Sequence, residues 1–554
     1  MSVAWIFDPP PPSGARKGGL ANAQIFDPDI DSFVREVLQN ARDQKIDTAE
    51  SVSVRFALKE FTGPDFVGLL EAMGWAELEP HINGAAEQGG ITIRQRLEDG
   101  LAQLDGGTLR VMLIEDRGTR GLTGGEDEEH GNFNALCRHE LVTSADRRDS
   151  GGSFGVGKSV LWRFSNLSTV IFGSWLDGED QMRFFGRSLL PWHETHDGAW
   201  EGSGWLGLPQ DAKGGARAVS LLGEEAEDLA MSCQVAREPG DSGTSILVVG
   251  FDEPTLEEEP AVDELCGLVV ESAARWFWPA LQAGQMEVLV EGWENDEEVF
   301  AKHVHPALPE TAPFVEAETG APEVDETLDG PGEILEREIT LSVPEQKHRP
   351  GHIDDPRPAV DAPLRLRVRM AESGEADHQN TVALRRGTGM VVDYHEIRQR
   401  SGLDLSFHAV LDAGTAQGDT EANKAAEEFL RAAEPPAHRE WTHRTERVKA
   451  EYKTGAKGAL DGLFGEIERV IRDLAKVEEI ESDEGPEALR KLFPLPGLGP
   501  VEPVPYYRLS DPQASLDGEA WNVAATYSRK EPQSLPWTFR VSLHIESRRL
   551  SETS

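Results

Sequence analysis

The fold of this chain is decided by residues 33–43, which read FVREVLQNARD. Acidic, turn-forming residues precede this stretch, and we expect it to form a helix. Glu36, Asn40 and Asp43 stand at i, i+4 and i+7, so at about 3.6 residues per turn they share one face. A polar stripe beside apolar neighbours is unusual for a simple surface helix. The alternative interpretation is an amphipathic helix with a polar outer face.

The stripe has the chemistry needed to activate water beside a metal ion. A carboxylate such as that of Glu36 can take a proton from an attacking water. The amide oxygen of Asn40 can hold Mg²⁺, which prefers oxygen ligands and usually keeps several waters. Taken alone, this motif does not separate the two interpretations.

A second motif follows an apolar strand. Residues 109–114 (LRVMLI) run directly into residues 115–121 (EDRGTRG). Gly118 and Gly121 come just after the strand, where glycine allows tight turns and the close approach of a ligand. Asp116 can accept a hydrogen bond from an exocyclic amine such as that of adenine. The alternative is a strand followed by an ordinary glycine turn.

A third motif is rich in glycine: residues 151–159 read GGSFGVGKS. It opens an expected helical stretch at residues 160–166. Backbone amides at the start of a helix bind phosphate, and Lys158 adds positive charge. The run from Gly152 to Ser159 also matches G-x-x-x-x-G-K-S, the P-loop pattern. A P-loop needs an apolar strand directly before its first glycine, whereas residues 144–150 (SADRRDS) are polar and charged. We therefore expect a phosphate-binding loop, and a P-loop NTPase is kept as an alternative.

In this order the three motifs resemble the GHKL superfamily of ATPases, which includes gyrase, large heat-shock chaperones, histidine kinases and MutL, with MORC proteins as relatives. The 33–43 helix resembles its N-box, Asp116-x-Gly118 its first glycine box, and residues 152–158 its second. Gly243-Thr244, before the strand-like residues 245–251, resembles the Gly-Thr that precedes the last strand of the ATP domain. The family pattern is D-x-G-x-G, and the extra residue here leaves the role of Gly121 open.

The resemblance implies roles for the motif residues. Glu36 would be the general base, Asn40 the magnesium ligand, and Asp116 the residue that binds the adenine amine. The implied cofactors are ATP and Mg²⁺, and residues 117–154 would form the ATP lid. The implied nucleotide-binding set is Asn40, Asp43, Asp116, Gly118, Gly121, Gly152, Gly155, Val156, Gly157, Lys158, Ser159 and Thr244.

A cation from a second domain completes such sites in the family. Residues 380–390 (NTVALRRGTGM) are the candidate segment, from which Arg385 or Arg386 would reach the γ-phosphate. Positive groups there stabilise the charge that develops in phosphoryl transfer. The implied catalytic set is therefore Glu36, Lys158 and Arg385. Two exposed arginines at the end of a strand are the alternative.

Composition and charge limit the class of protein. The chain has 554 residues, which is too long for one core and fits about three to four domains. Its formal charge of −45 argues against a surface that wraps nucleic acid. We find no run of eighteen apolar residues, no secretory signal and no metal spacing among the three cysteines. We expect a cytoplasmic protein that makes no membrane contact.

The expected fold is α/β throughout most of the chain. We expect a two-layer α/β sandwich of GHKL (Bergerat) type, an α/β transducer-like domain, a helical segment and a β-rich tail. Their expected bounds are 1–255, 256–420 with a Pro/Glu-rich insert near 304–363, 421–485 and 486–554. We expect most of this insert to be a long loop, with residues 334–343 as a candidate strand.

The expected function is slow, Mg²⁺-dependent ATP hydrolysis that drives a conformational switch, with homodimerisation on ATP binding. The partners would be other protein subunits of a defence or repair complex, with any DNA contact indirect. A non-hydrolysing ATP-sensing scaffold is a second hypothesis, and the P-loop NTPase is a third.

Overall fold

The computed structural model separates into two compact units, Met1–Val477 and Glu478–Ser554. The residues that it describes are 2–16, 18, 29–128, 131–139, 159–212, 215–256, 259–322, 328, 330–349, 353–387, 389–397, 406–435, 440–474, 507–509, 513–517, 520–524 and 527–529.

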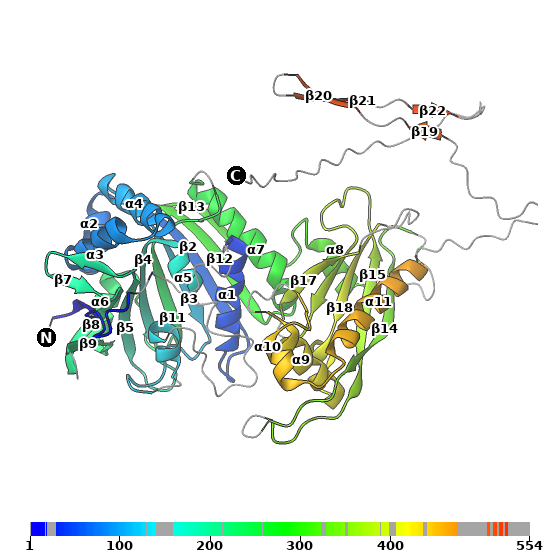
Figure 1. Ribbon diagram of the computed structural model, residues 1–554, viewed down its shortest axis with the longest axis horizontal. Coiled ribbons are helices and arrows are strands. Elements are labelled where there is room, and N and C mark those ends of the chain that lie inside the picture. Colours follow the sequence, from blue (N-terminus) through cyan, green and yellow to red (C-terminus); the bar gives the residue numbers. More distant parts are fainter. Residues whose placement is uncertain are drawn as a thin grey trace, which may run out of the picture. The chain divides into compact units, whose positions relative to one another are not determined.

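A large mixed sheet forms the first domain (Figure 1). It has 11 strands, nine of them in the order β1-β8-β5-β4-β11-β3-β2-β12-β13, with β9 beside β8 and β10 beside β5. The strands are β1 (Ala4–Phe7), β2 (Val52–Thr62), β3 (Thr108–Arg117), β4 (Ser165–Trp175), β5 (Met182–Leu189), β8 (Ser203–Ala212), β9 (Gly215–Val219), β10 (Leu221–Leu222), β11 (Gly243–Phe251), β12 (Met286–Glu294) and β13 (Glu297–His303). A separate hairpin pairs β6 (His193–Thr195) with β7 (Gly198–Trp200).

Both faces of this sheet are covered. Successive side chains along a strand point to opposite faces, and here both sets are apolar. Phe56 and Ile114 belong to one core, whereas Ala57 and Leu113, their neighbours in sequence, belong to the other. The first core is shared with α1 (Ile30–Asp43), α5 (Val160–Arg163) and α7 (Val262–Gln282). The second is shared with α2 (Gly63–Ala72), α3 (Trp75–Gln88), α4 (Ile91–Asp105) and α6 (Glu224–Ser232).

The expected α/β sandwich is therefore confirmed, with a further helical layer on its second face. Three helices of that layer lie between β2 and β3 in the sequence. The sheet also extends beyond the expected domain end at residue 255, because β12 pairs in parallel with β2 and β13 continues the sheet to His303.

The second domain is built on a five-stranded sheet in the order β14-β15-β18-β16-β17. Its strands are β14 (Ile334–Val343), β15 (Val360–Met370), β16 (Thr381–Arg385), β17 (Val391–Glu396) and β18 (Phe407–Asp412). One face packs on α9 (Glu421–Ala433), α10 (Glu446–Glu451) and α11 (Ala456–Leu474), and the other on α8 (Ala312–Thr319).

Two expectations about this region need correction. The helices between 421 and 474 share one apolar core with the sheet, so they do not form a segment of their own. The Pro/Glu-rich stretch contains α8 as well as the expected strand at 334–343. Helix α8 forms there because Phe314 is fully buried between α7 and the sheet.

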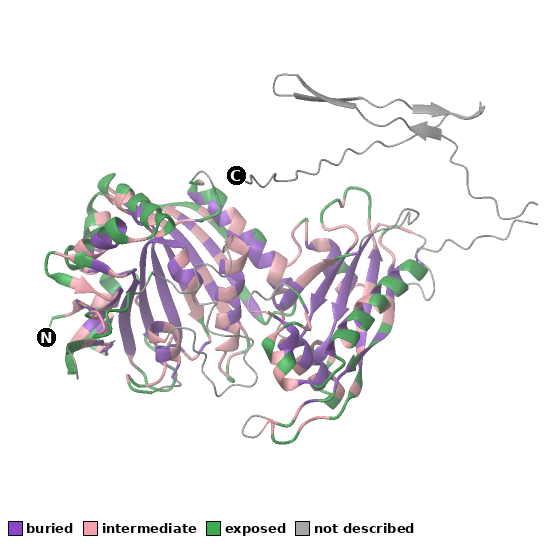
Figure 2. Ribbon diagram, in the orientation of Figure 1, coloured by how far each residue is buried: buried purple, intermediate pink, exposed green. Residues whose placement is uncertain are grey.

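Most strands of the two large sheets are mainly buried (Figure 2). Every residue of β4, β5 and β11 is buried, as expected for strands covered on both faces.

The described part of the chain contains no helix with the length and apolar character of a membrane span. In the C-terminal unit, β19 (Tyr507–Leu509) pairs with β22 (Tyr527–Arg529), and β20 (Gln513–Asp517) with β21 (Ala520–Ala524).

Candidate functional site

Helix α1 holds the first motif. Its N-cap is Asp29, whose side chain accepts a hydrogen bond from the backbone N–H of Ser32 at 2.9 Å. Glu36, Asn40 and Asp43 are half-buried on the helix. The side-chain amide of Asn40 donates to Oε1 of Glu36 at 3.2 Å. The polar stripe expected from the spacing is therefore formed.

The turn after β3 lies against the C-terminal end of α1. The backbone N–H of Arg120 donates to the carbonyl of Gln44 at 2.9 Å. The amide of Asn132 bridges the two segments, since it donates to Oε1 of Gln44 at 2.9 Å and to the carbonyl of Gly121 at 3.1 Å. The first and second motifs thus meet in space.

Gly121 has a steric role that the sequence left open. Its φ is +68°, and a Cβ there would lie 2.5 Å from Oγ of Ser174 and 2.8 Å from the carbonyl of Trp175. Gly118 also has a positive φ, of +74°. Gly121 therefore lets the turn pack closely against β4, and Gly118 lets it pass the backbone of Ser51.

Asp116 connects the second motif to the start of β11. Its Oδ1 accepts a hydrogen bond from the backbone N–H of Thr244 at 2.9 Å and another from the Thr119 hydroxyl. Its own carbonyl accepts from Nη2 of Arg237 at 2.6 Å. Burial raises the pKa of Asp116, while Arg237 and the two hydrogen bonds oppose that shift.

Arg237 is the member of this cluster that sequence reasoning missed. It is 9% exposed and also donates to the hydroxyl of Ser245 at 3.1 Å and to the carbonyl of Asp241 at 3.0 Å. It lies between α6 and β11, where no pattern distinguishes it. Its contacts depend on the pairing of β3 with β11, which only the fold provides.

The first part of the expected lid is fixed to the sheet. The side-chain amide of Asn134 donates to three backbone carbonyls, those of Gly125, Glu126 and Glu128, at 2.8–3.1 Å. Phe133 is fully buried. Of the expected lid, residues 117–128 and 131–139 are described, and Phe133 packs into the core of the first domain.

Most of the third motif lies outside the described residues, namely Gly152, Gly155, Val156, Gly157 and Lys158. Ser159 is described and is the N-cap of α5. That helix has four residues, fewer than the expected stretch 160–166, because β4 starts at Ser165.

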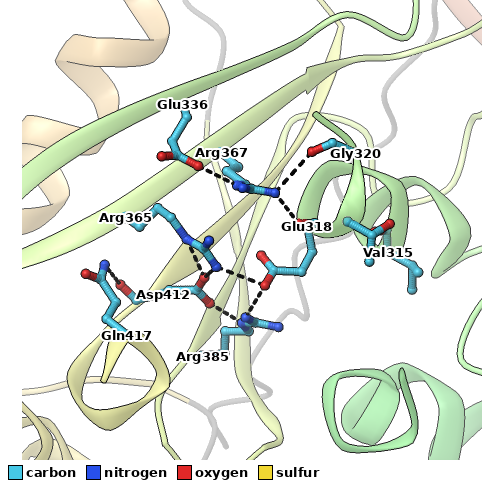
Figure 3. A network of polar contacts seen from close by, with 10 residues as sticks. Val315, Glu318, Gly320, Glu336, Arg365, Arg367, Arg385, Asp412 and Gln417 are labelled. Carbon is cyan, nitrogen blue, oxygen red and sulfur yellow. Dashed lines mark hydrogen bonds and ion pairs between the residues drawn. The ribbon is translucent and has the colours of Figure 1, made fainter. Parts of the chain in front are cut away.

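Arg385 belongs to a network of charges inside the second domain (Figure 3). It donates to Glu318 at 2.6 Å and also binds Asp412, and Arg365 contacts the same two carboxylates. This network ties α8 to the second sheet. Arg385 as a catalytic residue remains a prediction, and its contacts here are structural.

Arg386 is 1% exposed and lies between two carboxylates. It binds Glu434 at 2.5 and 2.8 Å and Glu427 at 2.7 Å. The alternative of two exposed arginines at the strand end is wrong, because both side chains are buried and paired.

No known family profile and no curated protein matches this chain. Among solved structures, the ATPase region of Saccharomyces cerevisiae topoisomerase II bound to ICRF-187 is 10% identical with a TM-score of 0.30, covering 69% of this chain and 73% of that chain. The N-terminal domain of a DNA repair protein is 9% identical with a TM-score of 0.30, covering 80% and 96%. The ATPase and transducer domains of topoisomerase II from Balamuthia mandrillaris are 10% identical with a TM-score of 0.29, covering 71% and 66%.

Proposed function

We propose that this chain is an ATPase of the GHKL type, with its nucleotide site between α1, the turn after β3 and the start of β11. The observation that carries the proposal is the hydrogen bond from Thr244 to Asp116, beside the contact of Arg120 with Gln44. Three segments that are far apart in the sequence meet here. Each carries the residue type that its proposed role needs.

Asp116 is the proposed adenine-binding residue. Both of its described side-chain bonds end on Oδ1, and Oδ2 is assigned to the exocyclic amine of the base. Gly118 and Gly121 let the backbone turn beside the base. Thr244 fixes the carboxylate of Asp116 in place.

Glu36 is the proposed general base, which accepts a proton from the attacking water. Its contact with Asn40 at 3.2 Å keeps the two side chains together on α1. Lys158 and the glycines of the third motif are assigned to the phosphates by their sequence pattern.

The residues present fit a bound Mg²⁺. Asn40 is the proposed ligand and supplies an amide oxygen, a hard donor, while Glu36 beside it is kept as the general base. Mg²⁺ usually takes only one or two protein ligands and completes its shell with phosphates and waters. When bound, it neutralises charge on the phosphates.

The short α5 favours this proposal over a P-loop NTPase. A P-loop leads from a strand into a helix whose first turn binds the phosphates. Here the helix after Ser159 has four residues and ends at Arg163, and β4 begins at Ser165.

The proposed output is a conformational switch. ATP binding favours a closed, homodimeric state, and hydrolysis releases it. The state of the switch is read by other protein subunits of a defence or repair complex, and DNA is involved only indirectly.

Asp116→Asn tests the adenine contact. The variant keeps an oxygen for Thr244 and Thr119 but presents an N–H₂ group to the amine of adenine. The loss of a hydrogen bond to a charged group costs about 1.5–3 kcal/mol, so the Kd for ATP should rise roughly 10- to 100-fold. Isothermal titration calorimetry measures this change.

The same substitution at an exposed aspartate is the matched control. Asp228 is exposed on α6, outside the proposed site, and Asp228→Asn should leave the Kd unchanged. Wild-type affinity in Asp116→Asn would remove Asp116 from the site. Because burial of this half-buried side chain raises the pKa of Asp116 and so disfavours its charged form at neutral pH, the Asn variant should be at least as stable as wild type to heating.

A further inference from the structure

Helix α1 carries a second stripe of charged residues. Asp31, Arg35 and Arg42 stand at i, i+4 and i+11, which at about 100° per residue places them within about 40° of one another. By the same count they lie roughly 140° around the helix from the stripe of Glu36 and Asn40. We call Asp31, Arg35 and Arg42 the joint stripe.

The N-terminal end of the joint stripe reaches the second domain through α7. Asp31 binds Arg275 of α7 at 3.0 Å, and Arg275 also binds Glu310 at 2.9 Å. The hydroxyl of Tyr394, on β17, donates to the backbone carbonyl of Arg275 at 2.6 Å. Helices α1 and α7 lie side by side (Figure 1).

Arg35 contacts the second domain directly. It is 4% exposed, and its Nη2 donates to the carbonyl of Val392 at 3.2 Å. Its guanidinium lies 4.0 Å from the ring centre of Trp276, a cation–π contact. Because β17 is an edge strand, its outer carbonyls have no neighbouring strand, and Arg35 supplies a donor there.

Arg42 lies against the loop that precedes β17. Gly389 has a φ of +69°, and a Cβ there would lie 2.5–2.6 Å from the guanidinium of Arg42. The neighbouring Met390 is fully buried in the core of the first domain. Arg42 donates to the neutral amide of Gln285 at 2.7 Å. Burial lowers the pKa of Arg42, and Asp43 opposes the shift.

We propose that the joint stripe transmits nucleotide occupancy from α1 to the second domain, with Arg35 and Arg42 as positioning residues. This inference rests on the proposed function of α1. A 14-residue helix moves as one body, so a ligand that shifts one stripe displaces the other. The backbone N–H of Gly389 donates to the carbonyl of Arg386 at 3.4 Å, and Arg386 is anchored to Glu427 of α9, so the displacement passes on to α9.

Hydrogen–deuterium exchange of the full chain, with and without Mg²⁺ and a non-hydrolysable ATP analogue, tests whether the joint stripe transmits nucleotide occupancy. In the wild type, the analogue should slow exchange in both α1 and β17. Arg42→Gln and Arg35→Gln should bind the analogue within about threefold of wild type but lose the response in β17. Arg35→Lys keeps a cation over Trp276 and should restore at least half of it.

Arg96→Gln is the control for a general loss of stability. Arg96 belongs to α4 on the opposite face of the sheet and donates to Oγ of Ser168 at 2.7 Å. This variant should keep the response in β17. The proposal for the joint stripe is overturned if both stripe variants bind the analogue and show the wild-type slowing of exchange in β17. It is also overturned if Arg96→Gln loses this response to the same extent. If the wild type does not bind the analogue, the proposed function itself is overturned. The proposal for the joint stripe rests on that function and is then overturned with it.

Discussion

Glu36→Gln should bind ATP with wild-type affinity and hydrolyse it about 10²- to 10⁴-fold more slowly, the range that general-base catalysis contributes. Glutamine cannot take a proton from the attacking water. It keeps an oxygen for the amide of Asn40, which lies 3.2 Å from Oε1 of Glu36. The variant therefore removes the proton acceptor while it keeps the hydrogen bond between positions 36 and 40. Mg²⁺-dependent phosphate release and nucleotide titration measure the two quantities.

The controls for this prediction also separate the three hypotheses for function. Glu98→Gln, at an exposed position of α4, should hydrolyse ATP like wild type. Normal hydrolysis by Glu36→Gln together with an inactive Lys158→Ala would favour P-loop chemistry instead. A wild-type protein that binds ATP without turnover would be a sensing scaffold, or an enzyme that requires its partner.

Local patterns in the sequence identified the elements of the site that depend on neighbours in the chain. The helix at 33–43 was predictable because its polar and apolar positions follow the helical period. The turn after β3 was predictable because an apolar run ends in Asp116 and closely spaced glycines. Both are present, and the hydrogen bond from Thr244 to Asp116 joins the second motif to the expected Gly-Thr.

Features that depend on distant pairing were not predictable in the same way. The extension of the first sheet beyond residue 255 results from β12 pairing with β2, more than two hundred residues earlier in the chain. Composition indicated a loop where α8 forms, because the burial of Phe314 depends on α7 and the second sheet. The partners of Arg385 and Arg386 lie on other elements, so their burial could not be read from the segment itself.

Arg386→Met should lower the free energy of unfolding of the second domain by about 3–5 kcal/mol, the cost of removing one partner from a buried ion pair. Arg386 and Glu434 are both 1% exposed in their side chains, and Glu427 is 16% exposed. Burial opposes the charged form of Arg386, but the two carboxylates outweigh burial and raise its pKa. The substitution leaves the Glu434 carboxylate buried without its cation. Urea unfolding followed by tryptophan fluorescence reports this loss, since Trp441 donates to Glu434 at 3.2 Å.

A second substitution shows whether charge is the cause. Arg386→Met combined with Glu434→Gln removes the uncompensated charge and keeps an acceptor for Trp441, so it should recover at least about 1 kcal/mol of the loss. Arg469→Met breaks an exposed pair with Glu466 and should leave the free energy of unfolding nearly unchanged. A loss in Arg386→Met as small as that of Arg469→Met would contradict the buried pair. A large loss that Glu434→Gln does not relieve would instead point to the packing of the arginine side chain.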